Sequence, residues 1–174
     1  MPNWCENQLT VEGLLEHVEA FVVQVQGAPE SWGAETPEPV QALCFNRIVP
    51  VPPDVVAQGY SPAGYHWCNR HWGTKWEPDI QHDVPEVSRQ PDGMAAANYL
   101  FDTAWSPPIP WLDAAAAGWP MLTFRLIHGE PGNDEYGEGL WEHGELTRYR
   151  RIDSSERPEW IAEHFAWVLE MQED

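Results

Sequence analysis

Positive charge is scarce in this chain. Lysine and arginine together number 9, against 28 aspartates and glutamates, which gives a formal net charge of −19 at pH 7. No lysine or arginine precedes Arg47. A field of this sign repels phosphate backbones, so it disfavours direct binding of nucleic acid. It attracts basic surfaces instead, and it also keeps a tryptophan-rich chain soluble.

Cysteine is scarce as well, and long apolar runs are missing. Cys5, Cys44 and Cys68 cannot all pair within the chain, and no signal peptide is found at its start. We therefore expect reduced thiols and a cytoplasmic protein. No apolar run approaches the roughly 20 residues that a bilayer-spanning helix needs, so we expect no membrane partner.

Common signatures of catalysis and cofactor binding are also missing. The chain contains no GxSxG, HExxH or GxxxxGK[ST] motif, and no GxGxxG follows a strand. Its HWCNRH segment does contain His66, Cys68 and His71, which are zinc-ligating residue types. Only arbitrary choices, His82 or Cys44, would complete a tetrahedral set, so ordinary packing of a loop is the preferred interpretation. The sequence predicts no cofactor and no metal, and it leans toward a protein without catalytic activity.

Hydrophobic periodicity predicts an α+β fold, with helices covering one face of a mainly antiparallel sheet. Residues 50–64 are too rich in proline and glycine for us to expect regular structure there. Ser106 is the expected cap of a short helix. The predicted elements are strands at 5–13, 42–49 and 121–128, helices at 14–26, 106–118 and 155–171, a hairpin joining 76–87 to 97–105 through QPDG, and a second hairpin within 137–152 that turns at His143 and Gly144.

Four blocks of sequence carry a resemblance to a known family. MPNWCENQLTVEG, FNRIVPVP, NRHWGTKW and FDTAWSPPIPWL occur in an order and spacing that resemble the YubB-type ferredoxin-like family of phage, plasmid and bacterial proteins. The resemblance implies a βαββαβ core without an iron–sulfur cluster, and it implies no particular activity. It covers roughly residues 1–150, with a Trp/His-rich insertion around 50–76, and leaves 151–174 as a helical extension of the same domain.

The single lysine lies in HWGTKW, between two tryptophans. The resemblance implies that WGTKW and FDTAWSPP meet in space. An ammonium group there can lie over an indole face, and a partly buried one needs a counter-charge, for which Asp102 is the first candidate. The preferred interpretation is an internal polar clamp, and the alternative is a pocket for a small anionic or aromatic ligand. The residues of this candidate site are Asn46, Trp72, Thr74, Lys75, Trp76, Asp102, Thr103, Trp105 and Ser106.

The C-terminal helix allows two interpretations. Its aromatic residues can dock onto the sheet, which is the preferred view. Alternatively, part of this row of aromatic residues remains exposed as a partner-binding face, and self-association through the helix is left open. The candidate partner-binding residues are Glu159, Trp160, Glu163, Trp167 and Glu170.

Charge and resemblance together suggest a function. We expect an acidic interaction protein of a phage or mobile element, acting in the cytoplasm of a bacterial host cell. Its partner would be a basic surface of a host protein or ribonucleoprotein. The specific hypothesis is that it inhibits a nucleic-acid-binding or defence complex by occupying this basic site. The alternative hypothesis is a small-ligand-binding domain or weak enzyme built around Lys75, Asp102 and the tryptophans.

Overall fold

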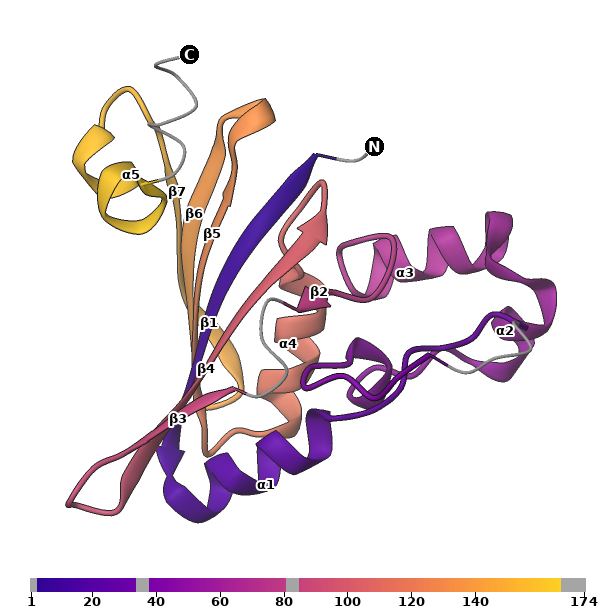
Figure 1. Ribbon diagram of the computed structural model, residues 1–174, viewed down its shortest axis with the longest axis horizontal. Helices are drawn as coiled ribbons and strands as arrows, with labels where there is room; N and C mark the ends of the chain where they lie inside the picture. The colour runs from indigo at the N-terminus through magenta and orange to yellow at the C-terminus, as the bar shows by residue number, and fades with distance from the viewer. Residues whose placement is uncertain (1–2, 34–37, 81–84, 167–174) are drawn as a thin grey trace.

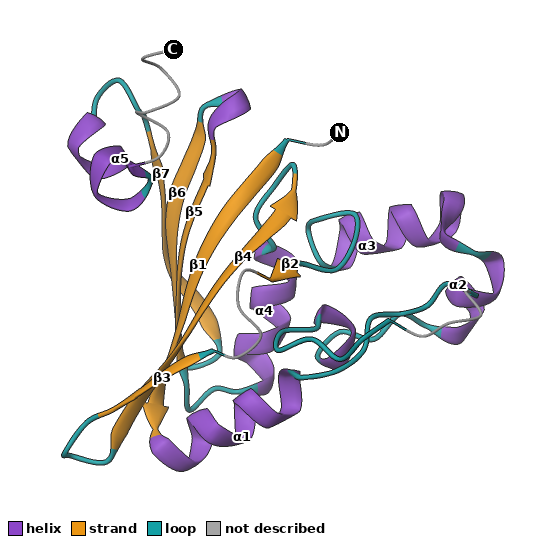
Figure 2. Ribbon diagram, viewed as in Figure 1, coloured by secondary structure: helices purple, strands orange, loops and turns teal. Residues whose placement is uncertain are grey.

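The chain folds into an antiparallel sheet of seven strands. This computed structural model describes residues 3–33, 38–80 and 85–166. The strands follow the order β2-β4-β1-β5-β6-β7, and β3 also pairs with β4, beside β2 at the same edge (Figures 1 and 2). Their bounds are β1 Trp4–Leu14, β2 Asp79–Ile80, β3 Glu86–Arg89, β4 Met94–Ala104, β5 Thr123–Glu130, β6 Glu135–Glu142 and β7 Glu145–Ile152.

The core follows a ferredoxin-like path, as expected. From β1 the chain passes through α1 to the edge formed by β2 and β3, returns along β4, and crosses through α4 to β5, which lies on the other side of β1. The hairpin of β6 and β7 extends the sheet beyond β5. The helices are α1 Leu15–Val25, α2 Pro53–Gln58, α3 Tyr65–His71, α4 Ile109–Gly118 and α5 Pro158–His164, with shorter helical turns at Phe45–Arg47, Tyr60–Gly64 and Pro131–Asn133. Among the described helices, none is long and apolar enough to span a membrane.

The two faces of the sheet bury different sets of side chains, because successive residues of a strand point to opposite sides. One face, which we call the covered face, carries Leu9, Phe101 and Leu126 and packs against α1 and α4 in the main core. The other, the uncovered face, carries the alternate residues of the same strands. At one end of the uncovered face, α5 forms a second small core, in which Trp160, Ile161 and Phe165 meet Tyr136 and Ile152. The expectation that all helices lie on one face is therefore wrong for α5.

Several predicted elements are confirmed. Residues 15–25 form α1, residues 109–118 form α4, and QPDG joins β3 to β4. His143 and Gly144 have φ angles of 55° and 87°, which is the left-handed geometry of a tight hairpin turn. Ser106 does not cap α4: Pro108 holds that position, and the Ser106 hydroxyl donates to the Gly73 carbonyl oxygen. The helix predicted over 155–171 is shorter: α5 begins at Pro158 and ends at His164, because Phe165 leaves the helical conformation with φ −136° and ψ 52°. Residues after 166 lie outside the described part of the chain.

The insertion between α1 and β2 differs from its prediction. Residues 42–49 do not form a strand, although Leu43, Cys44 and Phe45 are fully buried. A short apolar run satisfies a buried loop as well as a strand, and here Phe45 packs on Trp111 of α4 with ring centroids 4.7 Å apart. Residues 50–64 are largely helical rather than irregular, since Pro53 occupies the first turn of α2, where proline is tolerated.

Candidate functional site

Lys75 lies in the loop that joins α3 to β2, over the faces of two indole rings. Its Nζ is 4.0 Å from the centroid of the Trp76 ring and 5.9 Å from that of Trp105. Contacts of this kind contribute about 0.5–2 kcal/mol, depending on how far the ammonium is removed from water. Trp76 and Trp105 are both exposed, at 37% and 45%, so the lower part of this range applies.

The expected ion pair between Lys75 and Asp102 is not formed. The ion pairs among the described residues join Arg89 to Glu19, Arg150 to Glu138 and His17 to Glu16. Strand geometry gives the reason: Thr103 points to the covered face, where the Lys75 loop approaches β4, so Asp102 points to the uncovered face.

Hydrogen bonds nevertheless join the two tryptophan blocks. The Thr74 hydroxyl donates to the Ala104 carbonyl oxygen at 3.0 Å, and the Ser106 hydroxyl donates to that of Gly73 at 2.6 Å. The Thr103 hydroxyl donates to the Ser106 carbonyl oxygen at 2.8 Å. The polar groups expected to line a ligand pocket therefore bond within the chain.

The remaining two residues of the candidate site are also engaged within the fold. Trp72 is buried, and its Nε1 donates to the Val49 carbonyl oxygen at 2.9 Å. Asn46 accepts from the Val51 amide through Oδ1 at 2.7 Å. Apart from Asp102, the cluster has the geometry of an internal clamp between the insertion and the end of β4.

Glu77 is a member of this region that the sequence analysis missed. Its carboxylate accepts from the Phe45 amide at 2.5 Å, the Asn46 amide at 2.9 Å and the Cys44 thiol at 3.5 Å. Burial raises the pKa of the Glu77 carboxyl to about 7, although the amide hydrogen bonds act in the opposite direction. In a chain with 28 acidic residues, no local signal distinguishes this one.

The weak zinc candidates lie on different sides of α3. Cys68 is buried in the main core, where burial raises the pKa of its thiol to about 12, while His66 and His71 are exposed. The His71 ring stacks on Trp67 at 4.6 Å. Within the described ranges, no group of three or more His, Cys, Asp or Glu residues is arranged to hold a metal ion.

Trp160, one of the candidate partner-binding residues, is buried rather than presented to a partner. It is 7% exposed and belongs to the small core beneath α5. Phe165 is fully buried beside Tyr136, at 5.7 Å between ring centroids. Glu159 and Glu163 are exposed, and Trp167 and Glu170 lie outside the described residues.

A row of carboxylates crosses the uncovered face at the β2 edge. Asp79 is paired with Asp102, and Asp102 is paired with Glu6, so three acids lie opposite one another on β2, β4 and β1. We call these three residues the acidic row. Like charges that lie directly opposite each other repel across a sheet.

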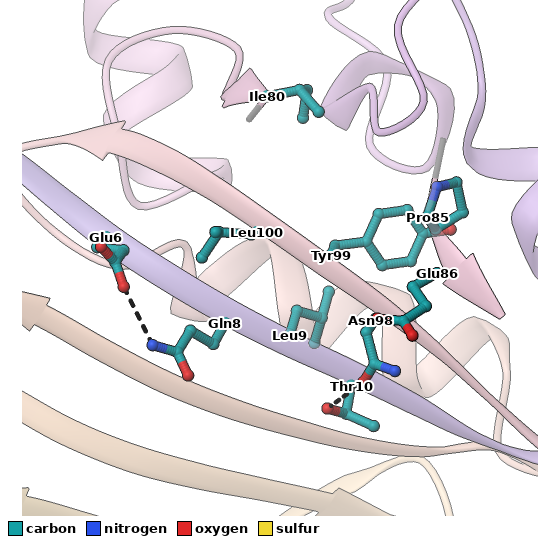
Figure 3. A pocket seen from close by; sticks show the side chains of 10 residues that line it. All are labelled: Glu6, Gln8, Leu9, Thr10, Ile80, Pro85, Glu86, Asn98, Tyr99 and Leu100. Carbon is teal, nitrogen blue, oxygen red and sulfur yellow. Dashed lines mark hydrogen bonds between the residues drawn. The ribbon is translucent and has the colours of Figure 1, made fainter. Parts of the chain in front are cut away.

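Beside the acidic row lies a cavity of about 510 Å³, shown in Figure 3. Glu6, Gln8 and Thr10 line it from β1, because they are alternate residues that face the same side. The Gln8 amide donates to Glu6 at 3.0 Å and the Thr10 hydroxyl donates to Asn98 at 2.9 Å. Asn98, Tyr99 and Leu100 line it from β4, and Ile80, Pro85 and Glu86 line it from the sheet edge.

Basic residues occupy the opposite half of the uncovered face. Arg125 of β5 lies across from Thr10 of β1, and the pairing continues through Leu140 to Arg148 of β7. In the next row, Arg150 forms its ion pair with Glu138 at 3.1 Å. The uncovered face therefore has an acidic half over β1, β4 and the β2–β3 edge and a mixed, arginine-bearing half over β5–β7.

Similarity to known proteins identifies the family of this chain. A search of curated proteins found no match. Among solved structures, the crystal structure of a protein api92 from Yersinia pseudotuberculosis matches with a TM-score of 0.49 and 17% identity, over 62% of this chain and 39% of that chain. The family model of the ferredoxin-like domain in Api92-like protein matches residues 71–166, more than half of the chain and a stretch that includes α5. The chain therefore belongs to the family of ferredoxin-like domains found in Api92-like proteins.

Proposed function

We propose that this chain is a non-catalytic acidic interaction protein that binds a basic surface on a partner protein or ribonucleoprotein. The observation that supports the proposal best is the acidic row, in which Asp79, Asp102 and Glu6 follow one another across adjacent strands. A sheet holds such carboxylates at fixed spacing, so they can compete with phosphates for an arginine- or lysine-lined groove. A net charge of −19 adds long-range attraction to any basic partner.

The YubB-type resemblance supports a setting for this activity. Members of that family are encoded by phages, plasmids and bacterial genomes, so the proposed site of action is the cytoplasm of a bacterial host. The proposed partner is a host nucleic-acid-binding or defence complex whose basic site the chain occupies in place of DNA or RNA. Such binding would inhibit the complex without any chemical step.

The alternative function, a small-ligand pocket or weak enzyme at Lys75, has less support. The hydroxyls of Thr74, Thr103 and Ser106 all donate to main-chain carbonyl oxygens. Asp102 lies in the acidic row instead of pairing with Lys75. These contacts favour the clamp, and the cavity described above is lined by other residues.

The test is capture of a partner by the immobilised chain from a bacterial lysate, with two variants of equal charge. The first variant neutralises the acidic half of the uncovered face through Glu6→Gln, Asp79→Asn, Glu86→Gln and Asp102→Asn. The control neutralises four exposed acids elsewhere through Glu16→Gln, Glu38→Gln, Asp54→Asn and Glu145→Gln. Circular dichroism establishes that both variants are folded before capture.

We expect the wild type and the control to retain the same basic protein, and the first variant to lose it. The retained protein should elute as salt rises, because salt screens the attraction between the two proteins. Heparin should also displace it, because this polyanion competes for the basic surface of the partner. A partner that is captured equally by all three chains, or that resists salt, would contradict the proposal.

A further inference from the structure

Three exposed tryptophans gather around the single lysine. Trp4, Trp76 and Trp105 are 41%, 37% and 45% exposed, and they are the most exposed tryptophans of the described chain. The Trp4 and Trp76 rings lie 6.4 Å apart between centroids, while Lys75 Nζ lies 4.0 Å from the Trp76 centroid and 5.9 Å from that of Trp105. We call these three indoles and Lys75 the tryptophan platform. An exposed aromatic cluster of this kind is typical of a binding surface.

The platform forms where three segments meet at one end of the sheet (Figure 1). Trp4 begins β1 and is paired with Ala104 at the end of β4, and Trp76 precedes β2. Trp105 follows β4 with a φ angle of 75°, a left-handed conformation that is unfavourable for a bulky side chain. Its amide donates to the Asn3 carbonyl oxygen at 2.9 Å, which holds the residue beside the start of β1. Backbone strain of this kind is concentrated at ligand-binding and other functional positions.

The side chains of the platform offer hydrogen-bond donors and no acceptors, because an indole N–H and an ammonium group can only donate. Within the described structure, the platform indoles make no hydrogen bond through Nε1, and Lys75 Nζ makes no ion pair. Other tryptophans do donate through Nε1 to groups of the fold, namely Trp72, Trp111 and Trp141. A ligand of the platform therefore has to bring acceptors, together with apolar surface for the indole faces.

The surrounding charge restricts which acceptors can approach. Glu6 follows Trp4 by two residues on β1 and faces the same side of the sheet, and the chain carries a net charge of −19. This field repels phosphates and carboxylates, which leaves neutral carbonyl oxygens. Helices bond their carbonyl oxygens internally, and a β-strand also brings N–H groups that need acceptors. A polyproline II helix has no internal hydrogen bonds, so its carbonyl oxygens are free, and proline residues carry no N–H.

We infer that the tryptophan platform binds a proline-rich segment of a partner protein in the polyproline II conformation. The proline rings lie against the indole faces, and the carbonyl oxygens of the segment accept from the indole N–H groups and from the Lys75 ammonium. Residues three positions apart in such a helix lie on the same side and about 9 Å apart, so successive rings contact neighbouring indoles. The inference goes beyond the proposed function, because a neutral proline-rich segment needs neither a basic partner nor the acidic row.

The test measures the affinity of decaproline, acetylated and amidated at its ends, by calorimetry and by tryptophan fluorescence. The comparison peptide has ten alternating alanine and glycine residues with the same capped ends, so it brings carbonyl oxygens without rings or a fixed conformation. We expect decaproline to bind at least roughly tenfold more tightly, because its conformation is set before binding. Its affinity should change little with salt, since the peptide is uncharged. Equal affinities of the two peptides would overturn the inference.

Variants of the exposed rings locate the binding. Trp4→Ala and, separately, Trp105→Ala should each weaken decaproline roughly tenfold, as expected for an aromatic contact near the centre of an interface. Met121→Ala, which truncates a 51% exposed side chain before β5, should bind like the wild type. Circular dichroism establishes that all three variants are folded. Full affinity in both tryptophan variants would contradict the inference, and tight binding of a neutral oligosaccharide such as cellohexaose in place of decaproline would overturn the inferred ligand class.

The inference and the proposed function fail in different ways. The variant that neutralises the acidic half of the uncovered face should lose the basic partner and keep decaproline. If decaproline does not bind while partner capture still depends on the acidic half, the inference is wrong and the proposed function stands. If decaproline binds while capture is indifferent to neutralisation of the acidic half, the proposed function is wrong and the platform stands.

Discussion

The covered face of this sheet packs against the polar clamp, and the uncovered face carries the acidic row. On the covered side, Thr74 bonds to Ala104 of β4 and Ser106 bonds to Gly73, and both contacts fasten the helical insertion to the end of β4. Glu77 bonds to Phe45 and Asn46 and joins two parts of the insertion to each other. On the uncovered side, Asp79, Asp102 and Glu6 follow one another across adjacent strands, and Glu6 accepts from the Gln8 amide. The clamp serves the fold, whereas the negative charge gathered in the acidic row suits the proposed basic partner.

The segment FDTAW shows how closely these two roles alternate. Phe101 and Thr103 are buried on the covered face, and Asp102 between them belongs to the acidic row. A single strand therefore contributes to the clamp and to the proposed interface through neighbouring residues. Substitutions should separate the two roles, because those on the covered face should change stability strongly and those in the acidic row should change it little.

The largest effect should come from the covered face, at Trp72. Trp72→Ala removes a 1% exposed indole that packs on Phe45 and donates to the Val49 carbonyl oxygen. We expect the free energy of unfolding, measured in urea, to fall by about 3–5 kcal/mol. The control is Trp76→Ala, whose side chain is 37% exposed and should cost less than about 1.5 kcal/mol. Equal losses would contradict the placement of Trp72 in the core and of Trp76 at the surface.

Glu77 should make stability depend on pH. Burial raises the pKa of its carboxyl from 4.5 to about 7, so the folded chain holds a proton that the unfolded chain has released between these values. Stability should therefore fall as pH rises through this window, by about 3 kcal/mol in total. Glu77→Gln, which cannot ionise, should lack this loss when urea unfolding is compared at about pH 5 and about pH 8.

His128 acts in the opposite direction and must be separated from Glu77. Burial lowers the pKa of its imidazole to about 4, so its contribution is lost as pH falls below its ordinary value. Comparing the variant with the wild type at each pH cancels the His128 contribution, because both proteins contain it. Glu145→Gln, at an exposed position, is the matched control and should follow the wild type. A Glu77→Gln profile parallel to that of the wild type would contradict the burial of an ionisable carboxyl.

Removal of the Lys75 ammonium group should lower the free energy of unfolding only slightly. Lys75→Met keeps an aliphatic chain against Trp76 and Trp105 but removes the ammonium, so we expect a loss of about 0.5–1 kcal/mol in urea unfolding. Arg157→Met, an exposed cation on the loop before α5, serves as control and should change less. A folded Lys75→Met protein that loses partner capture would instead favour the ligand-pocket interpretation of this cluster.

The sequence predicted local features better than contacts across strands. The contact between Lys75 and Trp76 joins neighbours, and the turn at His143 and Gly144 follows from two adjacent residues. The ion pair between Lys75 and Asp102 was wrongly predicted because Asp102 and Thr103 point to opposite faces of the sheet. The sequence FDTAW does not show which of the two faces the core, since Asp and Thr are both polar. The burial of residues 42–45 outside any strand depends on contacts with Trp111 and Glu77, both distant in the sequence.

The lining of the cavity could likewise be predicted only where it comes from a single strand. Alternation within ENQLT indicates that Glu6, Gln8 and Thr10 share a face, and this part could have been predicted. That Glu86 lies at the other end of the cavity depends on two registers, of β1 with β4 and of β4 with β3. Register is fixed by the packing of the whole sheet, so it is available only once the sheet is assembled.

The smallest effect, and the one of opposite sign, should come from the acidic row. Asp79→Asn removes one of two directly opposed carboxylates at an exposed edge, so we expect the free energy of unfolding to rise by about 0.2–0.5 kcal/mol. The gain should shrink at high salt, because screening already weakens the repulsion between Asp79 and Asp102. Glu38→Gln, an exposed acid in a loop, carries the same change in net charge and separates local repulsion from the general effect of charge. If Asp79→Asn destabilises the chain, the row contributes to the fold and the contrast between the two faces is lost. If it stabilises the chain while weakening partner capture, the acids are retained against the interest of folding, which is the signature expected of a binding surface.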